Sequence, residues 1–339
     1  MAVLSNSRLT LADVSKLTSP DGKVADVAEM LSQSQHILED IIYVEGNQAT
    51  SHVETIETGL PDVYFRAYNQ GVPTSKSTTV QITEPMAMLE ARSYVDTKLL
   101  ELNGNSMAVR FREDSRFARA MGQRMMNTIF NGNVGVDAKS FTGLATRYSD
   151  TTAGNGRNII KAGGVGADNA SMYLICWDED TVFCTYPKGS KAGLSYKNLG
   201  EEAIKDANGN EFQAMRSLFQ WDMGLVVKNH GYVVRICNID TDDFVNVTGT
   251  QALTASTNLL KLMMRAIARL PMENMGRCAF YCNRTIQEGL MIQGMEKSNS
   301  VLAVQPALTQ FGKTINQLSF LGYPIRTVDG LSIAETLVA

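Results

Sequence analysis

The run Ser106-Met-Ala-Val-Arg-Phe-Arg-Glu-Asp-Ser-Arg-Phe-Ala-Arg-Ala-Met-Gly-Gln-Arg-Met-Met-Asn-Thr-Ile-Phe130 decides the fold, because it predicts one long helix. Apolar side chains recur every fourth residue along it, and the charged ones fall largely off that line. The apolar members are Phe117, Met121, Met125 and Ile129. The turn Asn131-Gly132-Asn133 then ends the predicted helix.

The preceding residues, 47–84, have the composition of a polar β-arm. Strands are predicted at 51–58, 62–68 and 78–83, separated by turns at Gly59-Leu-Pro61 and Asn69-Gln-Gly71. An isolated two-stranded hairpin is marginally stable in water. The arm is therefore expected either to pack on its own domain or to lie across a neighbouring molecule.

The remaining sequence alternates helical and β patterns, which predicts the α+β class. A helix is expected to begin at Ser19-Pro20, with serine as its cap and proline at its first position, and to end near Gly46. A Gly-, Asn- and Thr-rich loop fills residues 132–170. Strands are expected within 171–186, 219–247, 277–282 and 318–328, with helices at about 254–270 and after Asn283.

The composition suggests a surface that partners cover. The chain has 339 residues, of which 44% are hydrophobic and 19% are charged, and the charged share is below the usual value of about 25%. Partner subunits are the simplest cover, and a large monomer with a polar, uncharged surface is the alternative. The formal net charge of −4 and the lack of a basic stripe argue against sequence-specific nucleic-acid binding.

The five cysteines, Cys176, Cys184, Cys237, Cys278 and Cys282, include no Cys-x-x-Cys motif. Their spacing fits neither a disulfide scaffold nor a zinc ribbon, so reduced thiols are expected. No window holds about 20 unbroken apolar residues and no secretion signal is evident, so no membrane association is expected.

Motifs that could carry chemistry are weak. Residues 307–314 satisfy a relaxed phosphate-loop pattern, but Leu308 and Phe311 occupy positions that need small residues, and the sequence that follows looks β rather than helical. The three histidines, His36, His52 and His230, have no recognisable nucleophile motif beside them. The acidic groups Asp178-Glu-Asp180 and Asp240, Asp242 and Asp243 are interpreted as solvated turns, with a divalent ion as the alternative. No catalytic, cofactor-binding or metal-binding residue is therefore predicted.

Methionines gather on the predicted helices, notably Met121, Met125, Met263 and Met264. Core filling is the simplest interpretation, and sliding of the helices during a structural change, since methionine re-packs easily, is the alternative.

The order of the segments resembles a known family. A polar β-arm is followed by a long helix closed by Ile129-Phe-Asn-Gly-Asn133, and then by Phe141-Thr-Gly-Leu144. Cys278-Ala-Phe-Tyr-Cys-Asn-Arg-Thr285 and Phe320-Leu-Gly-Tyr-Pro-Ile-Arg326 complete the pattern. This order is similar to the major capsid proteins of tailed bacteriophages with the Hong Kong 97-like fold. Further segments resemble a podophage-type subfamily, namely Leu60-Pro-Asp-Val-Tyr64, Asn69-Gln-Gly-Val-Pro73, Lys76-Ser-Thr-Thr79 and Pro187-Lys-Gly-Ser-Lys-Ala-Gly193.

The resemblance implies a domain plan. Residues 1–46 form an N-terminal arm with a helix, 47–85 an extension loop (E-loop), 86–145 a peripheral domain with its spine helix at about 106–130, and 146–339 an axial domain with the remaining peripheral elements. The β-rich block 171–247 precedes the segment that matches the usual axial core, so the connectivity between the two main domains stays open.

The resemblance also implies a function without catalysis. The subunit is expected to assemble as hexamers and pentamers into an icosahedral shell around double-stranded DNA, in the host bacterial cytoplasm, with scaffolding, portal and cement or decoration proteins as partners. Another phage structural protein, such as a tail-tube or decoration subunit, and a nucleotide-binding α+β enzyme are the alternatives. The residues expected to contact neighbouring subunits are His52, Glu54, Tyr64, Arg66, Tyr68, Lys76 and Thr78. A lysine at the arm's tip could also form an isopeptide crosslink, although an exposed, aggregation-blocking role for Lys76 is the default.

Overall fold

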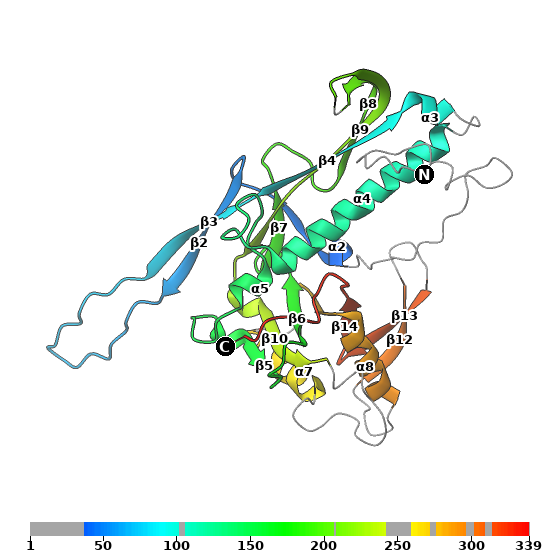
Figure 1. The fold of residues 1–339 in the computed structure, drawn as a ribbon. Coiled ribbons are helices and arrows are strands. Elements are labelled where there is room, and N and C mark those ends of the chain that lie inside the picture. Colours follow the sequence, from blue (N-terminus) through cyan, green and yellow to red (C-terminus); the bar gives the residue numbers. More distant parts are fainter. Residues whose placement is uncertain are drawn as a thin grey trace.

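The structure is a computed structural model, and it describes residues 37–101, 106–206, 208–241, 259–271, 276–295, 302–308 and 314–338. Strands dominate it, and one helix is far longer than the others (Figure 1). The helices are α2 (Ile37–Asp40), α3 (Thr97–Glu101), α4 (Ser106–Asn131), α5 (Leu144–Arg147), α7 (Leu259–Ile267) and α8 (Arg284–Met295), with short 3-10 turns η2 (Gly156–Asn158) and η3 (His230–Tyr232). The strands are β1 (Tyr43–Glu45), β2 (Ser51–Gly59), β3 (Thr78–Pro85), β4 (Ala87–Asp96), β5 (Ile159–Lys161), β6 (Asn169–Trp177), β7 (Val182–Tyr186), β8 (Ser195–Lys205), β9 (Glu211–Val227), β10 (Val233–Asp240), β11 (Arg277–Cys282), β12 (Leu302–Leu308), β13 (Thr314–Phe320) and β14 (Tyr323–Thr327).

A twelve-stranded mixed sheet forms the body of the molecule. Its main path runs β12-β13-β14-β11-β6-β7-β9-β4, while β10 pairs with β5 and β6, β1 with β7, and β8 with β9. The β-rich block 171–247 and the C-terminal third therefore share one sheet, since β6 pairs with both β10 and β11. Strands β2 and β3 form a separate two-stranded sheet.

The central strand β6 explains why the body needs helices on both sides. All nine of its residues are buried. Because side chains alternate along a strand, Tyr173 and Ile175 belong to one apolar cluster, and Met172 and Leu174 belong to the other. Helix α4 covers the first cluster, and α7 and α8 cover the second.

Helix α4 confirms the predicted long helix and its apolar stripe. Met121, Met125 and Ile129 are buried in the core, and Phe117 stacks on Phe219 with ring centroids 6.0 Å apart. On α7, Met263 is buried as predicted. Met264 was wrongly predicted as core, because it lies on the outer side of the helix and is 46% exposed.

Other predicted elements need correction. The helix predicted from Ser19 lies mostly outside the described residues. Its described end, α2, stops at Asp40, and Tyr43–Glu45 continue instead as strand β1 paired with β7. Residues 62–68 are not a strand, because nothing in the described chain pairs with them. The loop 132–170 contains the short elements α5 and β5, and strands β4 and β8 were not predicted.

Strands β8 and β9 make a long hairpin that, with β4, extends the sheet beyond the body, at the top of Figure 1. Helix α4 holds this extension through a buried polar cluster. Arg110 Nη2 donates to Asn198 Oδ1 at 2.6 Å, and Ser217 Oγ donates to Asp114 Oδ2 at 2.9 Å. These long-range contacts fix the direction of the hairpin relative to the helix.

The expectation of fully reduced cysteines is also corrected. Cys176 on β6 and Cys278 on β11 are direct partners in the antiparallel ladder and form a disulfide. Cys184, Cys237 and Cys282 are free and buried. Sequence spacing could not show the pair, because 102 residues separate its members.

Candidate functional site

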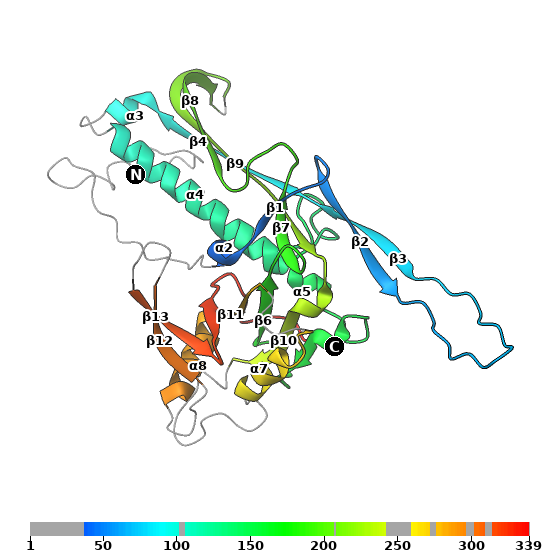
Figure 2. The same ribbon diagram turned by 180° about the vertical axis from the view of Figure 1, so that it is seen from behind.

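The most distinctive surface belongs to the arm, residues 51–85, which projects from the body in both views (Figures 1 and 2). Its strands β2 and β3 pair from Ser51↔Pro85 to Gly59↔Thr78, with one register shift after Glu57. Beyond that pairing, residues 60–77 form the tip, which has no strand structure. A hydrogen bond from the backbone N–H of Asp62 to Ser75 Oγ, 2.8 Å long, joins the two sides of the tip.

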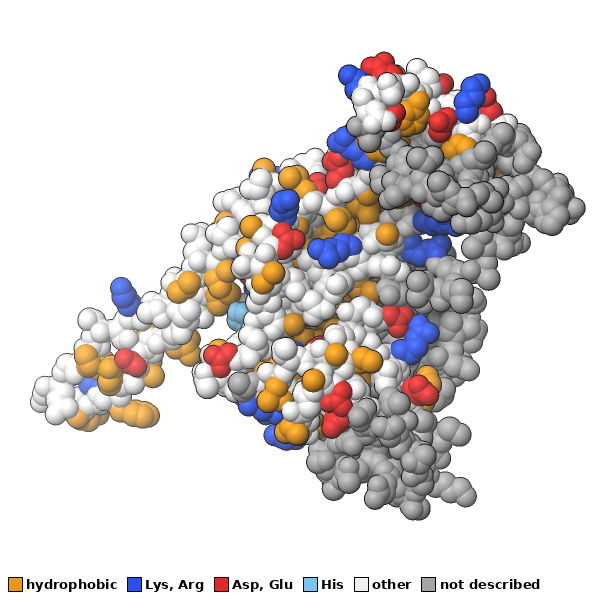
Figure 3. All heavy atoms as spheres, in the orientation of Figure 1, with side chains coloured by type: hydrophobic (Ala, Val, Ile, Leu, Met, Phe, Trp, Pro, Cys, Tyr) orange, Lys and Arg blue, Asp and Glu red, His pale blue; other side chains and the backbone are white. Residues whose placement is uncertain are grey.

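The tip carries apolar side chains that its own chain does not bury. Val63 is 90% and Tyr68 is 98% exposed. Other large apolar residues of the tip are also exposed, namely Leu60, Tyr64, Phe65 and Val72. Figure 3 shows hydrophobic side chains gathered on the surface near the far end of the arm. A concentration of exposed apolar residues of this kind marks an interaction surface.

The root of the arm is held by a buried ion pair. Arg147 on α5 makes two hydrogen bonds to the Glu84 carboxylate on β3, at 2.6 and 2.7 Å, and a third to the carbonyl of Leu225 at 3.2 Å. Both charged side chains are about nine-tenths buried. Because the bidentate geometry fixes direction as well as distance, the pair orients the arm on the body.

His230 lies close to this ion pair. Burial lowers the pKa of His230, the positive charge of Arg147 lowers it further, and Glu84 partly opposes the shift. The histidine is therefore kept neutral beside the arm's root at neutral pH.

Two residues predicted to contact neighbours also lie at the root. His52 is buried and packs edge-on against Phe183 of the body, with ring centroids 5.6 Å apart. Glu54 lies 3.5 Å from the His52 Nε2 atom and 3.9 Å from Lys228 Nζ. Lys228 also donates to Asp180 at 2.9 Å, and this hydrogen bond raises the pKa of Lys228. The structure thus gives His52 and Glu54 contacts inside their own chain.

The other predicted contact residues lie farther out. Tyr64, Arg66, Tyr68 and Lys76 are exposed in the tip. Thr78 is exposed at the end of β3, where its carbonyl accepts a 3.1 Å hydrogen bond from Thr58 Oγ1. The predicted set therefore divides into residues at the root and residues at the tip.

The motifs 129–133 and 141–144 meet where α4 ends. The Gly143 N–H donates to the Gly132 carbonyl at 2.8 Å. A Cβ on Gly132 would lie 2.3 Å from the Phe141 carbonyl oxygen, and one on Gly143 would lie 2.6 Å from the Phe130 carbonyl oxygen. Only glycine permits this approach, which places Phe130, Phe141 and Leu144 in the core and sets α5 beside the arm's root.

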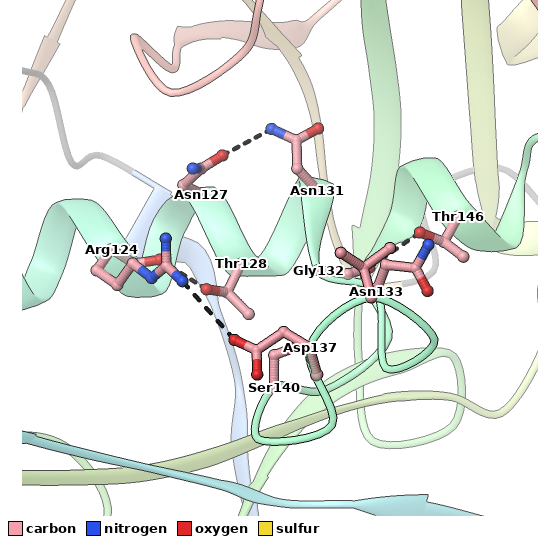
Figure 4. A pocket seen from close by; sticks show the side chains of 10 residues that line it. Arg124, Asn127, Thr128, Asn131, Gly132, Asn133, Asp137, Ser140 and Thr146 are labelled. Carbon is pink, nitrogen blue, oxygen red and sulfur yellow. Dashed lines mark hydrogen bonds and ion pairs between the residues drawn. The ribbon is translucent and has the colours of Figure 1, made fainter.

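A cavity of about 300 Å³, lined mostly by residues with polar side chains, borders this junction (Figure 4). Its lining groups mostly bond one another. Asn131 Nδ2 donates to Asn127 Oδ1 at 2.6 Å, and Thr146 Oγ1 donates to the Gly132 carbonyl at 2.9 Å. Arg124 and Asp137 lie 4.0 Å apart across the opening. These contacts tie the loop to the helix end, and we assign no ligand to the cavity.

The C-terminal tail, residues 329–338, returns to the body and is fixed there by side chains. Arg235 Nη2 donates to Glu335 Oε2 at 2.8 Å, and Ser171 Oγ donates to the same oxygen at 2.5 Å. The side-chain amide of Asn238 makes two 3.0 Å hydrogen bonds to the backbone of Val338. These side-chain hydrogen bonds hold the tail on the body, although much of its own surface stays exposed.

The motifs considered for chemistry do not assemble into a site among the described residues. Thr314, at the end of the phosphate-loop pattern, begins strand β13, where such a loop requires a helix, while residues 309–313 lie outside the described part. Asp178 and Asp180 lie in the turn between β6 and β7, whereas Asp242, Asp243 and His36 lie outside the described residues. Within the described ranges no group of three or more His, Cys, Asp and Glu residues could hold a metal ion. Nor does any described helix have the length and apolar character to cross a membrane.

Comparison with known proteins agrees with this architecture. The family model of the major capsid protein GP7 matches residues 19–339. A chain in the near-atomic resolution structure of bacteriophage epsilon15 is 29% identical, with a TM-score of 0.77 and coverage of 100% of this chain and 99% of that one. A chain of the bacteriophage JBD30 capsid is 10% identical over 95% of this chain and 99% of its own, with a TM-score of 0.49. No curated protein sequence matches significantly.

The match to the epsilon15 chain spans both chains, so the two share a fold. The expected Hong Kong 97-like capsid fold of the α+β class is confirmed, and the tail-tube, decoration and nucleotide-binding alternatives lose their support. The chain belongs to the family of the major capsid protein GP7, and it is a structural subunit of the icosahedral shell of a tailed bacteriophage.

Proposed function

We propose that copies of this chain form hexamers and pentamers that close into the shell, and that the arm tip of each copy lies on the adjacent copy. The exposed apolar side chains of residues 60–72 carry this proposal. Their burial at about 25 cal/mol per Å² favours association. Each contact is modest, but one subunit makes several, so the closed shell gains stability through multivalency.

The root and the tip of the arm have different roles in this proposal. The Glu84–Arg147 pair sets the arm's direction, and the tip supplies the contact. Tyr64, Arg66, Tyr68 and Lys76 belong to the contact surface, with Thr78 at its border. His52 and Glu54 act as positioning residues at the root, since they bond within their own chain. Lys76 contributes charge at the exposed tip.

The proposed function also implies a division of the chain into domains. We assign residues 1–46 to an N-terminal arm, 47–85 to the E-loop, 86–145 to a peripheral domain around α4, and 146–339 to an axial domain with the remaining peripheral elements. Heterologous contacts between such subunits generate rings, and small differences in the angle between neighbouring subunits permit both pentamers and hexamers. We expect the extended arms to bend so that their contacts are kept at both angles.

The shell encloses double-stranded DNA without reading its sequence, and the subunit carries out no catalysis. Assembly takes place in the host bacterial cytoplasm, with scaffolding, portal and cement or decoration proteins as candidate partners. The net charge of −4 supports enclosure without tight, general binding to phosphate.

A charge introduced into the tip tests the proposal. Val63→Asp should reduce the yield of closed particles at least tenfold, measured by negative-stain microscopy and sedimentation velocity of the purified chain. Val165→Asp is the matched control, because Val165 is an equally exposed valine (84%) in a loop of the body. Closed shells from Val63→Asp in wild-type yield, or a wild-type chain that stays monomeric at every concentration, would refute the proposal.

A further inference from the structure

The Cys176–Cys278 disulfide crosses a junction within the large sheet. Cys176 on β6 and Cys278 on β11 lie directly opposite each other in the antiparallel ladder that runs from Arg277↔Trp177 to Tyr281↔Tyr173. Along the main path of the sheet, this ladder joins β11, β14, β13 and β12 to the remaining strands. The disulfide therefore links the C-terminal strands covalently to the central strand β6.

The two strands are also held together without the disulfide. Side chains of directly opposite residues in an antiparallel pair lie on the same face of the sheet, and Cys176 and Cys278 accordingly belong to the same apolar cluster. On the other face, Trp177 Nε1 donates to the Tyr281 hydroxyl at 2.9 Å across the same two strands. The ladder and these contacts bring the two sulfur atoms together, so the subunit can fold while both cysteines are thiols.

The pairing of these two cysteines is specific. Cys184, Cys237 and Cys282 are buried and free. Burial raises the pKa of Cys282 to about 12, and it also raises the pKa values of Cys184 and Cys237. Because thiol–disulfide exchange requires a thiolate, these three thiols compete poorly for the pair. Cys278 is half-buried beside the exposed Arg277, so it is the member of the pair that lies closer to solvent.

We propose that the Cys176–Cys278 bond is absent during assembly and forms after the particle leaves the host cell, where it stabilises the closed shell. The inference rests on the proposed assembly in the bacterial cytoplasm, because glutathione and thioredoxin keep thiols reduced there. After release, the two thiols lose two protons and two electrons as the S–S bond forms. Dissolved dioxygen accepts them and becomes hydrogen peroxide. The structure describes the oxidised subunit.

The bond acts on the stability of the shell and not on its assembly. A disulfide restricts the unfolded chain, and in the chain-entropy account its effect grows with the length of the loop that it closes. Here the two cysteines are 102 residues apart in the sequence, so the closed loop is long. Strands β6 and β11 lie within the body, whereas the arm projects away from it (Figure 2). The contacts proposed for the arm tip therefore do not need the disulfide.

Thiol trapping tests when the bond forms. Cells that contain assembled shells are lysed without oxygen in urea and iodoacetamide, and a second sample of shells is kept in aerated buffer before the same treatment. Mass spectrometry of the non-reduced peptides then compares the peptides linked through Cys176 and Cys278 with the two alkylated peptides. We expect about tenfold more linked peptide in the aerated sample. Equal amounts in the two samples, or none in either, would overturn the inference.

Heating the shells tests what the bond does. Aerated wild-type shells should melt at a temperature at least about 5 °C higher than the same shells reduced with a phosphine. Cys278→Ser should form shells in wild-type yield, and these should melt like the reduced wild type with or without the phosphine. The comparison of oxidised with reduced wild type stands alone if Cys278→Ser does not fold. Equal melting of those two wild-type samples would contradict the stabilising role.

The inference and the proposed function fail in different ways. Negative-stain microscopy counts the shells in each sample. Shells that form normally and melt alike whether oxidised or reduced refute only the role of the disulfide. A chain that never forms shells refutes the proposed function, and this inference with it.

Discussion

The arm tip and the C-terminal tail are both irregular segments with little sheet pairing, but only the tail is held by hydrogen bonds to the body. The tail, residues 329–338, is fixed by Arg235 and Asn238 of β10. The tip, residues 60–77, leaves its apolar side chains in water. Because the burial of exposed apolar groups is favourable, the tip should gain from contact with another surface, whereas hydrogen bonds to Arg235 and Asn238 already hold the tail on the body.

This difference separates subunit stability from assembly. Substitutions that remove the tail's buried ion pair should destabilise the subunit, and substitutions in the tip should leave it folded but unable to assemble. Substitutions at the arm's root should affect both subunit stability and shell assembly. The Glu84–Arg147 pair belongs to the folded body and also fixes the direction in which the arm projects.

The largest expected effect is on the tail. Glu335→Ala leaves Arg235 buried without its carboxylate, and the loss of one partner from a buried pair costs about 3–5 kcal/mol. Urea unfolding of the unassembled subunit measures it. Leu337→Ala, at an exposed position of the same tail, serves as control and should change the free energy of unfolding by less than about 0.5 kcal/mol. Equal effects from the two variants would show that the tail is not fixed by its ion pair.

A somewhat smaller effect is expected at the root. Glu84→Ala should cost about 2–4 kcal/mol, because it leaves the Arg147 guanidinium with backbone carbonyls alone. It should also lower the yield of regular shells, seen by electron microscopy. Glu57→Ala, an exposed position on strand β2 of the same hairpin, provides the comparison and should leave both readouts unchanged. If Glu84→Ala formed regular shells in wild-type yield, the Glu84–Arg147 pair would not be needed to fix the direction of the arm.

The tip should contribute almost nothing to subunit stability. Phe65→Ser with Tyr68→Ser should change the free energy of unfolding by less than about 0.5 kcal/mol, since both rings are already in solvent. The same variant should fail to form particles. A loss of more than about 1 kcal/mol would mean that the tip packs on its own subunit in solution.

The smallest effect concerns pH. The lowered pKa of His230 means that the unfolded chain takes up a proton at a higher pH than the folded chain does. Stability should therefore be constant well above the ordinary histidine value of about 6.5 and should decrease as pH falls below it. His230→Asn should reduce this decrease between pH 7.5 and 5.5, measured by urea midpoints. An unchanged slope would contradict the assignment.

Local patterns in the sequence predicted much of the fold. The four-residue recurrence in 106–130 gave the correct helix, and the turn after it was placed correctly, because the signals lie within a few residues. Residues 62–68 look like a strand by composition, but none of the strands in the described ranges pairs with them. Strand β8 was missed, since most of its side chains are exposed and only its pairing with β9 makes it a strand.

The candidate site was predicted only in part. Exposed tip residues such as Tyr64 and Tyr68 followed from the arm's polar, β-rich character. The Glu84–Arg147 pair and the Cys176–Cys278 disulfide did not, because each joins residues far apart in the chain. Sequence spacing carries no signal for such contacts, and the tertiary fold alone creates them.

A cryo-electron microscopy map of the assembled shell tests the central claim most directly. We predict continuous density for residues 60–77 resting on an adjacent copy, with Val63, Phe65 and Tyr68 removed from solvent. Density that folds the tip back on its own body, or that leaves those side chains in solvent between copies, would contradict the account.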